Sequence, residues 1–234
     1  MGPRVTMHHA TSPAVPAEAT VRTRALASAR GWSLDVFNAG EFADPRYRAN
    51  PANRCFFCKT NLYGAIAAPT RSTILWGTNL DDLGEYRPGL DAARDHEVRH
   101  PFVGAGIDKA TVRALSAACG LGAVAALPSA PCLASRVETG IVIDPSTLAM
   151  IDAAEIMLRN ALSPGAVRCR VRGTGIVVEL DAATLTRLRA RARARWLAPS
   201  PIWPETMGLL TARLPLPPIA SAQASCARQY DDNG

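Results

Sequence analysis

The alternation of helical and strand-like patterns between residues 17 and about 125 restricts the fold of this chain more than any other feature. Residues 17–30 are rich in Ala and Arg and contain no proline, so they predict a helix. Residues 33–37 alternate apolar and polar side chains as a short strand does. Residues 71–77 form an apolar run typical of a buried parallel strand. This alternation predicts a doubly wound α/β domain with a parallel sheet.

Capping residues place two further helices in the same region. Asn53 stands where it can cap a helix over the segment that begins with residues 54–59. Asp108 precedes a second apolar-periodic segment, residues 109–118, and Gly120 suits the end of that helix. The side chains expected in its core are Val112, Leu115, Ala118 and the following Cys119.

The pattern changes after residue 136. A helix over residues 145–160 precedes two strand-like segments, residues 167–172 and 175–180, and Gly173-Thr174 between them predicts a hairpin. An arginine-rich helix follows, and two helices can cover one face of a hairpin. The sequence therefore predicts an α/β domain over residues 1–136, a small α+β domain over residues 137–200, and a loosely ordered tail over residues 201–234, which is rich in Pro, Ala and Ser.

Composition favours an ordinary globular protein. The chain has 234 residues, of which 48% are hydrophobic and 20% are charged. No apolar run approaches the roughly 18 residues that span a bilayer. Residues 1–16 lack the apolar segment of a secretory signal. We therefore expect no membrane association and a cytoplasmic location.

Three of the six cysteines carry the strongest chemical signal. Cys55 and Cys58 are three residues apart, and Cys132 lies in a segment that Pro128 and Pro131 keep extended and exposed. Three thiolates with one open position suit an iron–sulfur cluster. Two thiols alone are also typical of a zinc knuckle, a redox pair or two small core residues, and Cys132 alone suits a nucleophile or a sulfur donor. The residues by themselves leave these interpretations open.

Charged side chains mark further candidate sites. The alternate arginines of residues 168–172 face one side of a strand, which is typical of an anion site and equally of an exposed sheet face. Asp81 and Asp82 follow a predicted strand, where they could hold Mg²⁺ beside a nucleotide or simply cap a turn. The planar fork of Arg87 suits phosphate. The arginine-rich segment at residues 187–195 predicts a solvated helix, and its lack of aromatic side chains disfavours nucleic-acid binding.

Ordered blocks of residues also carry a family resemblance. The blocks are Asn50-Pro51, Arg54-Cys55-Phe56-Phe57-Cys58-Lys59, Leu62-Tyr63, Gly77-Thr78-Asn79-Leu80-Asp81-Asp82, Tyr86-Arg87-Pro88-Gly89, Lys109 with Val112-Arg113, and Cys132-Leu133-Ala134-Ser135-Arg136. In their order and spacing they resemble the LarE family of ATP-dependent sulfur transferases. The resemblance extends from about Thr20 to Leu180.

This resemblance implies a fold and an activity. The fold is an adenine nucleotide α-hydrolase-like (HUP) domain of the PP-loop class, followed by a small domain. Family members use ATP and Mg²⁺ to adenylate a carboxylate of a pyridinium dicarboxylic acid mononucleotide, and then place sulfur on its carboxyl carbon for the nickel-pincer cofactor. Some members give up the sulfur of one cysteine, which corresponds to Cys132. Members with three cysteines, which this chain resembles, are able to hold a [4Fe-4S] cluster.

The resemblance also assigns residues. Cys55, Cys58 and Cys132 match the cluster ligands, and Cys132 matches the catalytic cysteine. The small-molecule nucleotide substrate is expected to contact Ser135, Arg136, Glu155, Arg168, Arg170 and Glu179. The residues expected beside ATP and Mg²⁺ are Asp81, Asp82, Tyr86 and Arg87. The family further implies a homo-oligomer.

The N-terminus departs from the family pattern. Family members begin with a strand and a Ser-Gly-Gly-x-Asp-Ser loop that holds the ATP pyrophosphate, and residues 1–10 contain no such loop. With residues 5–8 as the remnant of the second strand, the sequence predicts either a start placed too far downstream or a truncated relative. The segment after Trp196 also matches the family poorly. The alternative function is therefore a non-catalytic relative that carries sulfur or a cluster, or that assists assembly.

Overall fold

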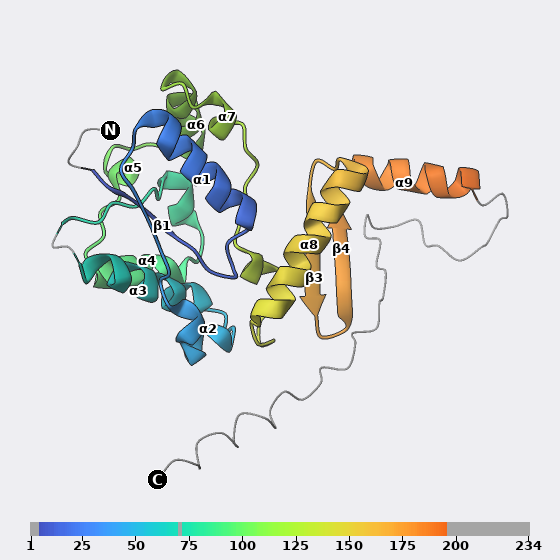
Figure 1. Cartoon of the computed structure of the whole chain (residues 1–234), viewed down its shortest axis with the longest axis horizontal. Helices are drawn as coiled ribbons and strands as arrows, with labels where there is room; N and C mark the ends of the chain where they lie inside the picture. The colour runs from blue at the N-terminus through green and yellow to red at the C-terminus, as the bar shows by residue number, and fades with distance from the viewer. Residues whose placement is uncertain (1–4, 70–71, 196–234) are drawn as a thin grey trace, which may run out of the picture. The chain divides into compact units, whose positions relative to one another are not determined.

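The computed structural model describes residues 5–69 and 72–195 of the chain (Figure 1). The chain divides into two compact units, one that ends at Ala153 and one that begins at Ala154. Both contain helices and a small sheet, so the described fold is mixed α/β. The tail predicted over residues 201–234 lies outside the described residues. No helix in the described part of the chain is long and apolar enough to cross a membrane.

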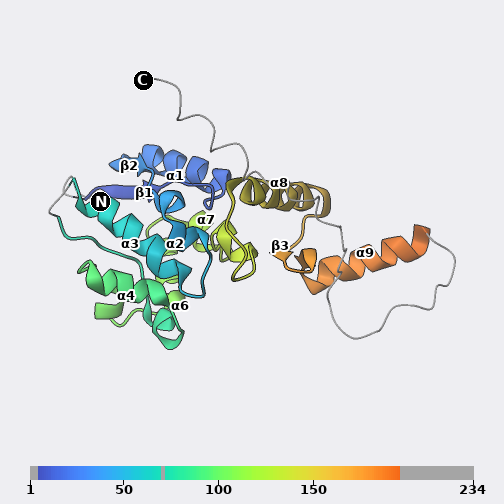
Figure 2. The same ribbon diagram turned by 90° about the horizontal axis from the view of Figure 1, so that it is seen from below.

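The first unit opens with a parallel pair of strands. β1 (Met7–Ala10) pairs with β2 (Leu34–Phe37), and α1 (Ala17–Arg30) connects them with the predicted bounds. The His9 ring of β1 forms a hydrogen bond of 3.0 Å with the Thr20 hydroxyl of α1, and Figure 2 shows the strand pair between α1 and α3. Successive side chains of a strand point to opposite faces. His9 contacts α1 on one face, and Ala10 packs against the core cluster of α3 on the other, so the pair has helices on both sides. The paired residues are Met7 with Leu34, His8 with Asp35, His9 with Val36 and Ala10 with Phe37.

The core of the first unit lies between α3 (Arg54–Ala67) and α4 (Pro88–Asp95). Leu62, Tyr63 and Ile66 of α3 are buried, and their spacing of one, three and four residues places them on one helical face. Small alanine side chains of α4 let the two helices approach closely, and strand residues pack against the same cluster. The other members of this core are Ala92, Ala93 and Val98, with Ala10, Phe37, Ala39, Phe56 and Ile74 packed against it.

The predicted strand at residues 71–77 is reduced to a single bridge. Leu75 pairs in parallel with Arg99, and the backbone N–H of Trp76 donates to the Arg99 carbonyl at 2.9 Å. Leu75 is 56% exposed, so the prediction of a buried strand is wrong. A parallel strand is buried where helices cover both of its faces and strands flank its edges. Among the described residues, this segment pairs with the Arg99 segment alone.

The helix predicted at residues 109–118 forms with those bounds, as α6 (Lys109–Ala118). The Asp108 side chain accepts a hydrogen bond of 2.7 Å from a backbone N–H in the first turn. Gly120 follows in the left-handed region, at a φ of 73°. The predicted burial is wrong, because periodicity shows which residues share a face and not whether that face is covered. Leu115, Ala118 and Cys119 are exposed, and Val112 is half-buried.

Short elements complete the first unit. The 3-10 helix η1 (Glu41–Ala43) and α2 (Pro45–Arg48) lie between β2 and α3. The others are η2 (Leu80–Gly84), α5 (Pro101–Gly104), α7 (Gly122–Ala125) and η3 (Leu133–Arg136).

The second unit consists of the end of α8 (Pro145–Leu162), a hairpin and α9 (Ala182–Arg195). β3 (Val167–Arg172) and β4 (Gly175–Leu180) are antiparallel, which confirms the predicted hairpin. Buried and half-buried side chains alternate along β3, so its arginines share one face as predicted. The paired residues run from Val167 with Leu180 to Arg172 with Gly175.

Candidate functional site

The first turn of α3 carries two of the three candidate cysteines. Cys55 is exposed and Cys58 is half-buried. The helix begins at Arg54, as predicted, but the Asn53 side chain makes no capping hydrogen bond. The backbone N–H of Arg54 donates instead to the Pro51 carbonyl at 3.0 Å. The electropositive backbone at a helix N-terminus favours a thiolate, but burial acts in the opposite direction and outweighs it at both cysteines.

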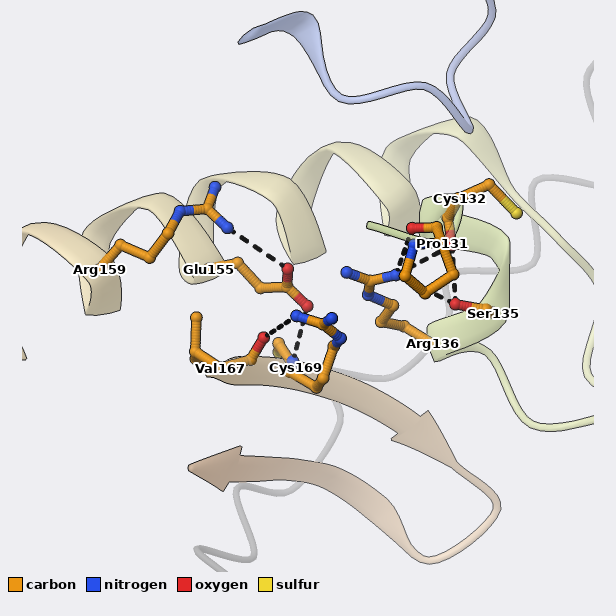
Figure 3. Close-up of polar contacts among 9 residues, drawn as sticks. Pro131, Cys132, Ser135, Arg136, Glu155, Arg159, Val167 and Cys169 are labelled. Carbon is orange, nitrogen blue, oxygen red and sulfur yellow. Dashed lines mark hydrogen bonds and ion pairs between the residues drawn. The ribbon is translucent and has the colours of Figure 1, made fainter. Parts of the chain in front are cut away.

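Cys132 lies on a loop that a buried arginine holds in shape (Figure 3). The cysteine is exposed and directly precedes η3. Arg136 is only 4% exposed, and its guanidinium donates to the carbonyls of Pro131 at 2.6 Å and Cys132 at 3.1 Å. The Ser135 hydroxyl donates to the same Cys132 carbonyl at 2.8 Å. Ser135 and Arg136, expected as substrate contacts, thus fix the backbone that carries the Cys132 thiol.

Asn50 connects the segment before α3 to the segment after η3. Its side-chain amide donates to the carbonyls of Glu138 and Ile141, at 2.9 Å each. Its own carbonyl accepts the backbone N–H of Gly140 at 2.9 Å. Asn50 is fully buried at a φ of 55°, a conformation that Asn tolerates better than most residues. The sequence could not reveal these contacts, because the partners of Asn50 lie about ninety residues away along the chain.

The structure brings the three candidate cysteines into one electrostatic neighbourhood. Burial, opposed by the Lys59 ammonium and aided by the Cys132 sulfur, raises the pKa of the Cys58 thiol to about 12. Burial also raises the pKa of Cys55. The charge of Arg54 lowers this pKa, and the Cys132 sulfur raises it further. Cys132 is therefore one of the groups whose charge acts on both thiols of α3.

Cys55, Cys58 and Cys132 are the residues that could hold an iron–sulfur cluster, because cysteine thiolates are its usual ligands. Within residues 5–69 and 72–195, no three His, Cys, Asp or Glu side chains form a group that could hold a metal ion. A [4Fe-4S] cluster binds each cysteine through a different iron, so its ligands do not meet at one point. The cationic side chains Arg54 and Lys59 offset the negative charge of three thiolates. Three cysteines would leave one iron without a protein ligand.

Lys59 adjoins Cys58 in the sequence and belongs to this site, but no pattern along the chain predicted the aromatic contacts of its ammonium. It stands four residues after Cys55 and therefore on the same helical face. Its ammonium lies 3.5 Å from the ring centroid of Trp76 and 5.9 Å from that of Tyr63. Burial lowers the pKa of Lys59, and the sulfur of Cys58 is the strongest of the opposing influences.

Two buried residues near the thiols were also missed. Burial raises the pKa of Tyr47, and the sulfurs of Cys132 and Cys58 add to this effect. The Glu41 carboxylate also raises the pKa of Cys58, and its effect is smaller than those of burial, Lys59 and Cys132. Glu41 is 5% exposed, and its Oε2 atom has no hydrogen-bond partner within the described part of the chain. Isolated residues of this kind have no motif that could reveal them.

The residues expected beside ATP and Mg²⁺ contact one another or nearby backbone. Asp82 completes a capping box at the start of η2 and forms an ion pair of 3.0 Å with Arg87. Asp81 accepts the backbone N–H that begins α6 at 3.2 Å. Tyr86 is 78% exposed. The turn-capping interpretation of the two aspartates, which the sequence left open, describes their contacts in this structure.

The arginine face of β3 includes a carboxylate from β4. Glu179 lies 2.7 Å from Nε of Arg170 and 3.4 Å from Arg172. Arg168 donates to the carbonyl of Val167 at 2.7 Å. Arg170 and Glu179, expected as separate substrate contacts, therefore form an ion pair with each other. Glu179 neutralises part of the positive charge that the sequence predicted for this face.

Glu155 ties α8 to β3 within the second unit (Figure 3). It is 1% exposed. Its Oε1 atom accepts the backbone N–H of Cys169 at 3.0 Å, and its Oε2 atom lies 3.7 Å from Arg159. Burial raises the pKa of the Cys169 thiol, and the Glu155 carboxylate adds to that effect. The residue expected as a substrate contact thus acts as a buried acceptor for the sheet backbone.

Comparisons with known proteins find relatives without an assigned activity. The chain is 36% identical over 155 residues to an uncharacterized protein of Synechocystis, a match that covers 64% of this chain and 58% of that protein. It is 29% identical over 136 residues to an uncharacterized protein of Methanocaldococcus jannaschii, covering 56% of this chain and 52% of the other. The matches thus span little more than half the length of these curated relatives. No family model matches the chain.

Proposed function

We propose that this protein is a sulfur transferase of the LarE type, which places sulfur on an adenylated carboxylate of a pyridinium dicarboxylic acid mononucleotide. The observation that carries the proposal is the electrostatic influence of Cys132 on Cys55 and Cys58, which are separated from it by more than seventy residues. The order and spacing of the sequence blocks between these cysteines support it further. A cytoplasmic homo-oligomer is part of the same proposal.

The proposal includes a doubly wound sheet of the adenine nucleotide α-hydrolase-like (HUP) type. The parallel β1–β2 pair with its α1 crossover supports this assignment, as does the parallel bridge between Leu75 and Arg99. In such sheets ligands bind beyond the carboxyl ends of the strands. Residues 38–53 lead from the carboxyl end of β2 to the turn that carries Cys55 and Cys58.

The proposed reaction has two steps. A carboxylate resists nucleophilic attack, so one of its oxygens first attacks the α-phosphorus of ATP, and pyrophosphate leaves, with Mg²⁺ on the phosphates. A sulfur nucleophile then attacks the acyl carbon, the C–O bond to AMP breaks, and AMP leaves with its electron pair. The product is a thiocarboxylate. Cationic groups such as Arg54 and Lys59 stabilise negative charge that develops near the sulfur.

Cys55, Cys58 and Cys132 would hold the [4Fe-4S] cluster in this proposal. The cluster would supply exchangeable sulfide at the iron that no cysteine holds. Without a cluster, the Cys132 thiol itself would be the sulfur donor: its sulfur would form a thioester with the acyl carbon, and β-elimination would then remove the Cα proton, break the Cβ–S bond and leave dehydroalanine at position 132. The backbone contacts of Arg136 and Ser135 serve both routes, because they keep the Cys132 side chain exposed on an ordered loop.

Anaerobic reconstitution with iron and sulfide tests the cluster. We expect a broad visible absorption that disappears in Cys132→Ala and persists in Cys119→Ala, a matched control at an exposed cysteine directly after α6. Equal absorption in both variants would remove the cluster from the proposal. Loss of one sulfur from Cys132 after turnover, detected by mass spectrometry, would then identify the cysteine as the donor.

A second candidate is a carrier or assembly partner that does not bind ATP. The contacts of Asp81, Asp82 and Arg87 favour it, because these residues already cap or pair within the chain. Isothermal titration of the protein with ATP and Mg²⁺ separates the two candidates. Tight binding would exclude the carrier, whereas no detectable binding at millimolar ATP would exclude adenylation by this chain.

A further inference from the structure

The side chain of Lys59 is held at two points along its length. α4 begins with Pro88-Gly89, and a Cβ atom added at Gly89 would stand 3.1 Å from Cγ of Lys59. That distance is shorter than an ordinary carbon–carbon contact, so a larger residue at position 89 would require the lysine stem to shift by a few tenths of an ångström. At its other end, the Lys59 ammonium lies 3.5 Å from the ring centroid of Trp76. The face of an indole ring is the best aromatic partner for a cation.

Trp76 is itself fixed in position. Its ring packs edge-to-face against Tyr63, with 5.8 Å between the ring centroids and 82° between the planes. Tyr63 belongs to the buried core. The Trp76 backbone is held by the hydrogen bond to Arg99. The indole therefore provides a rigid platform between the core of the first unit and the lysine ammonium.

All three candidate cysteines interact electrostatically with the Lys59 ammonium. The helical spacing places it one turn from Cys55, and it lowers the pKa of Cys55 and Cys58 against the effect of burial. The cationic groups that act most on Cys55 are Arg54, Lys59 and Arg87. Lys59 differs from the two arginines in that its position depends on an aromatic ring.

We propose that Trp76 is a positioning residue, which holds the Lys59 ammonium beside the three cysteines and makes their site selective for small anions over neutral reactants. The anions in this class are monovalent species such as a hydrosulfide, a thiolate or a carboxylate. This selection of anions requires only a fixed positive charge beside a reactive thiol. It is therefore expected whether the sulfur comes from a cluster or from Cys132, and also if the protein is a carrier that does not bind ATP.

Alkylation of the full chain by two reagents of similar size tests this proposal. Iodoacetate is anionic and iodoacetamide is neutral, and the rate of each at Cys132 is followed by peptide mass spectrometry at one pH and low ionic strength. The ratio of the two rates cancels the fraction of thiolate, which is common to both reactions, and reports the local charge. Cys119 in the same sample is the internal reference, because it is exposed and lies at the end of α6.

We expect Lys59→Met and Trp76→Leu each to lower the ratio of the iodoacetate rate to the iodoacetamide rate at Cys132 by about fivefold. This is the effect of one charge several ångströms away at an effective dielectric near that of water. The ratio at Cys119 is expected to stay constant. Trp32→Leu, which removes a tryptophan after α1, is the matched control and is expected to leave both ratios unchanged. Added salt should reduce the difference between wild type and variants.

A double-mutant cycle separates positioning from a general loss of structure. If Trp76 acts through Lys59, adding Trp76→Leu to Lys59→Met leaves the ratio at Cys132 where the single Lys59 variant set it. A ratio unchanged by Trp76→Leu, or lowered again in the double variant, would overturn the proposal. Should Trp76→Leu fail to fold, Trp76→Phe keeps a ring for the ammonium and is expected to stay within about twofold of wild type. A Trp76→Phe ratio as low as that of Lys59→Met would equally overturn it.

Discussion

Replacing Asn50 tests whether one buried side chain holds the cysteine segments in their relative positions. Its amide donates to the Glu138 and Ile141 carbonyls at 2.9 Å each, and its backbone adopts a φ of 55°. Asn50→Gly removes the amide and accepts this φ freely, whereas Asn50→Ala removes the amide and places a Cβ atom in a strained conformation. The two variants therefore separate the hydrogen bonds from the backbone strain.

The expected magnitudes follow from these contacts. Each hydrogen bond contributes about 1 kcal/mol, and the buried carbonyls left without a donor add a similar cost, so Asn50→Gly is expected to lower the free energy of unfolding by about 3 kcal/mol. Asn50→Ala adds about 1 kcal/mol of left-handed strain. The carboxylate of Asn50→Asp would face two carbonyl oxygens, and we expect it to be the most destabilising of the three variants.

Urea denaturation of the full chain, followed by far-ultraviolet circular dichroism, measures these differences as shifts in the transition midpoint. Glu97→Gly is the matched control. Glu97 is exposed and has a φ of 53°, so the same replacement there removes only strain. We expect it to be neutral or slightly stabilising, by at most about 1 kcal/mol.

The reasoning would be refuted if Asn50→Gly changed the free energy of unfolding by less than about 0.5 kcal/mol, the size of a typical surface substitution. Equal losses in Asn50→Gly and Glu97→Gly would refute it as well. If Asn50→Gly and Asn50→Ala lost equal stability, the loss of the hydrogen bonds would still explain the result. Only the expected cost of the left-handed backbone strain in Asn50→Ala would be contradicted.

Three further predictions concern other described contacts. The pKa of Asp181 is lowered to about 2, mainly by hydrogen bonds from the Thr184 backbone N–H and hydroxyl. Because the pKa of the folded protein is depressed, the contribution of Asp181 to stability is present above the unfolded value of about 4 and is lost as the pH falls toward 2. We expect Asp181→Asn to remove that part of the pH dependence of unfolding, measured by circular dichroism between these values. Glu155→Ala leaves the buried Cys169 N–H without its acceptor and is expected to cost about 2 kcal/mol in urea denaturation, whereas Glu155→Gln keeps an acceptor and is expected to cost less than about 1 kcal/mol. Arg136→Met loses bonds to loop carbonyls worth about 2 kcal/mol and should speed proteolytic cleavage of that loop by about thirtyfold, while cleavage elsewhere stays constant.

Local features of the sequence were sufficient to predict the elements that depend on nearby residues. α1 and α6 have the predicted bounds, because helix-forming composition and an aspartate cap are properties of neighbouring residues. The hairpin of β3 and β4 also formed as predicted, since a two-residue turn brings adjacent segments together without help from other elements.

Features that depend on distant partners were not predictable in the same way. The apolar run at residues 71–77 was expected to be a buried strand, but burial requires neighbours that the run itself does not specify. Cys119 was expected in the core for a similar reason and is exposed. The contact of Lys59 with Trp76 joins residues from α3 and the Leu75 bridge, so it has no motif along the chain. The sequence offered Cys55, Cys58 and Cys132 as one possible ligand set among several interpretations, and only the resemblance assigned them to one shared site.

The Cys132 loop shows why buried polar side chains matter for this site. A reactive thiol has to stay exposed, so apolar packing of its own side chain cannot hold it in place. Ordering a loop costs about 1 kcal/mol or more for each residue. At Cys132 this cost is offset by hydrogen bonds from buried Arg136 to loop carbonyls and by the bond of 2.8 Å from the Leu133 N–H to the Ala14 carbonyl. The exposed thiol and the side chains that order its loop are therefore separate, and replacing Arg136 should disorder the backbone that carries Cys132 without removing the thiol itself.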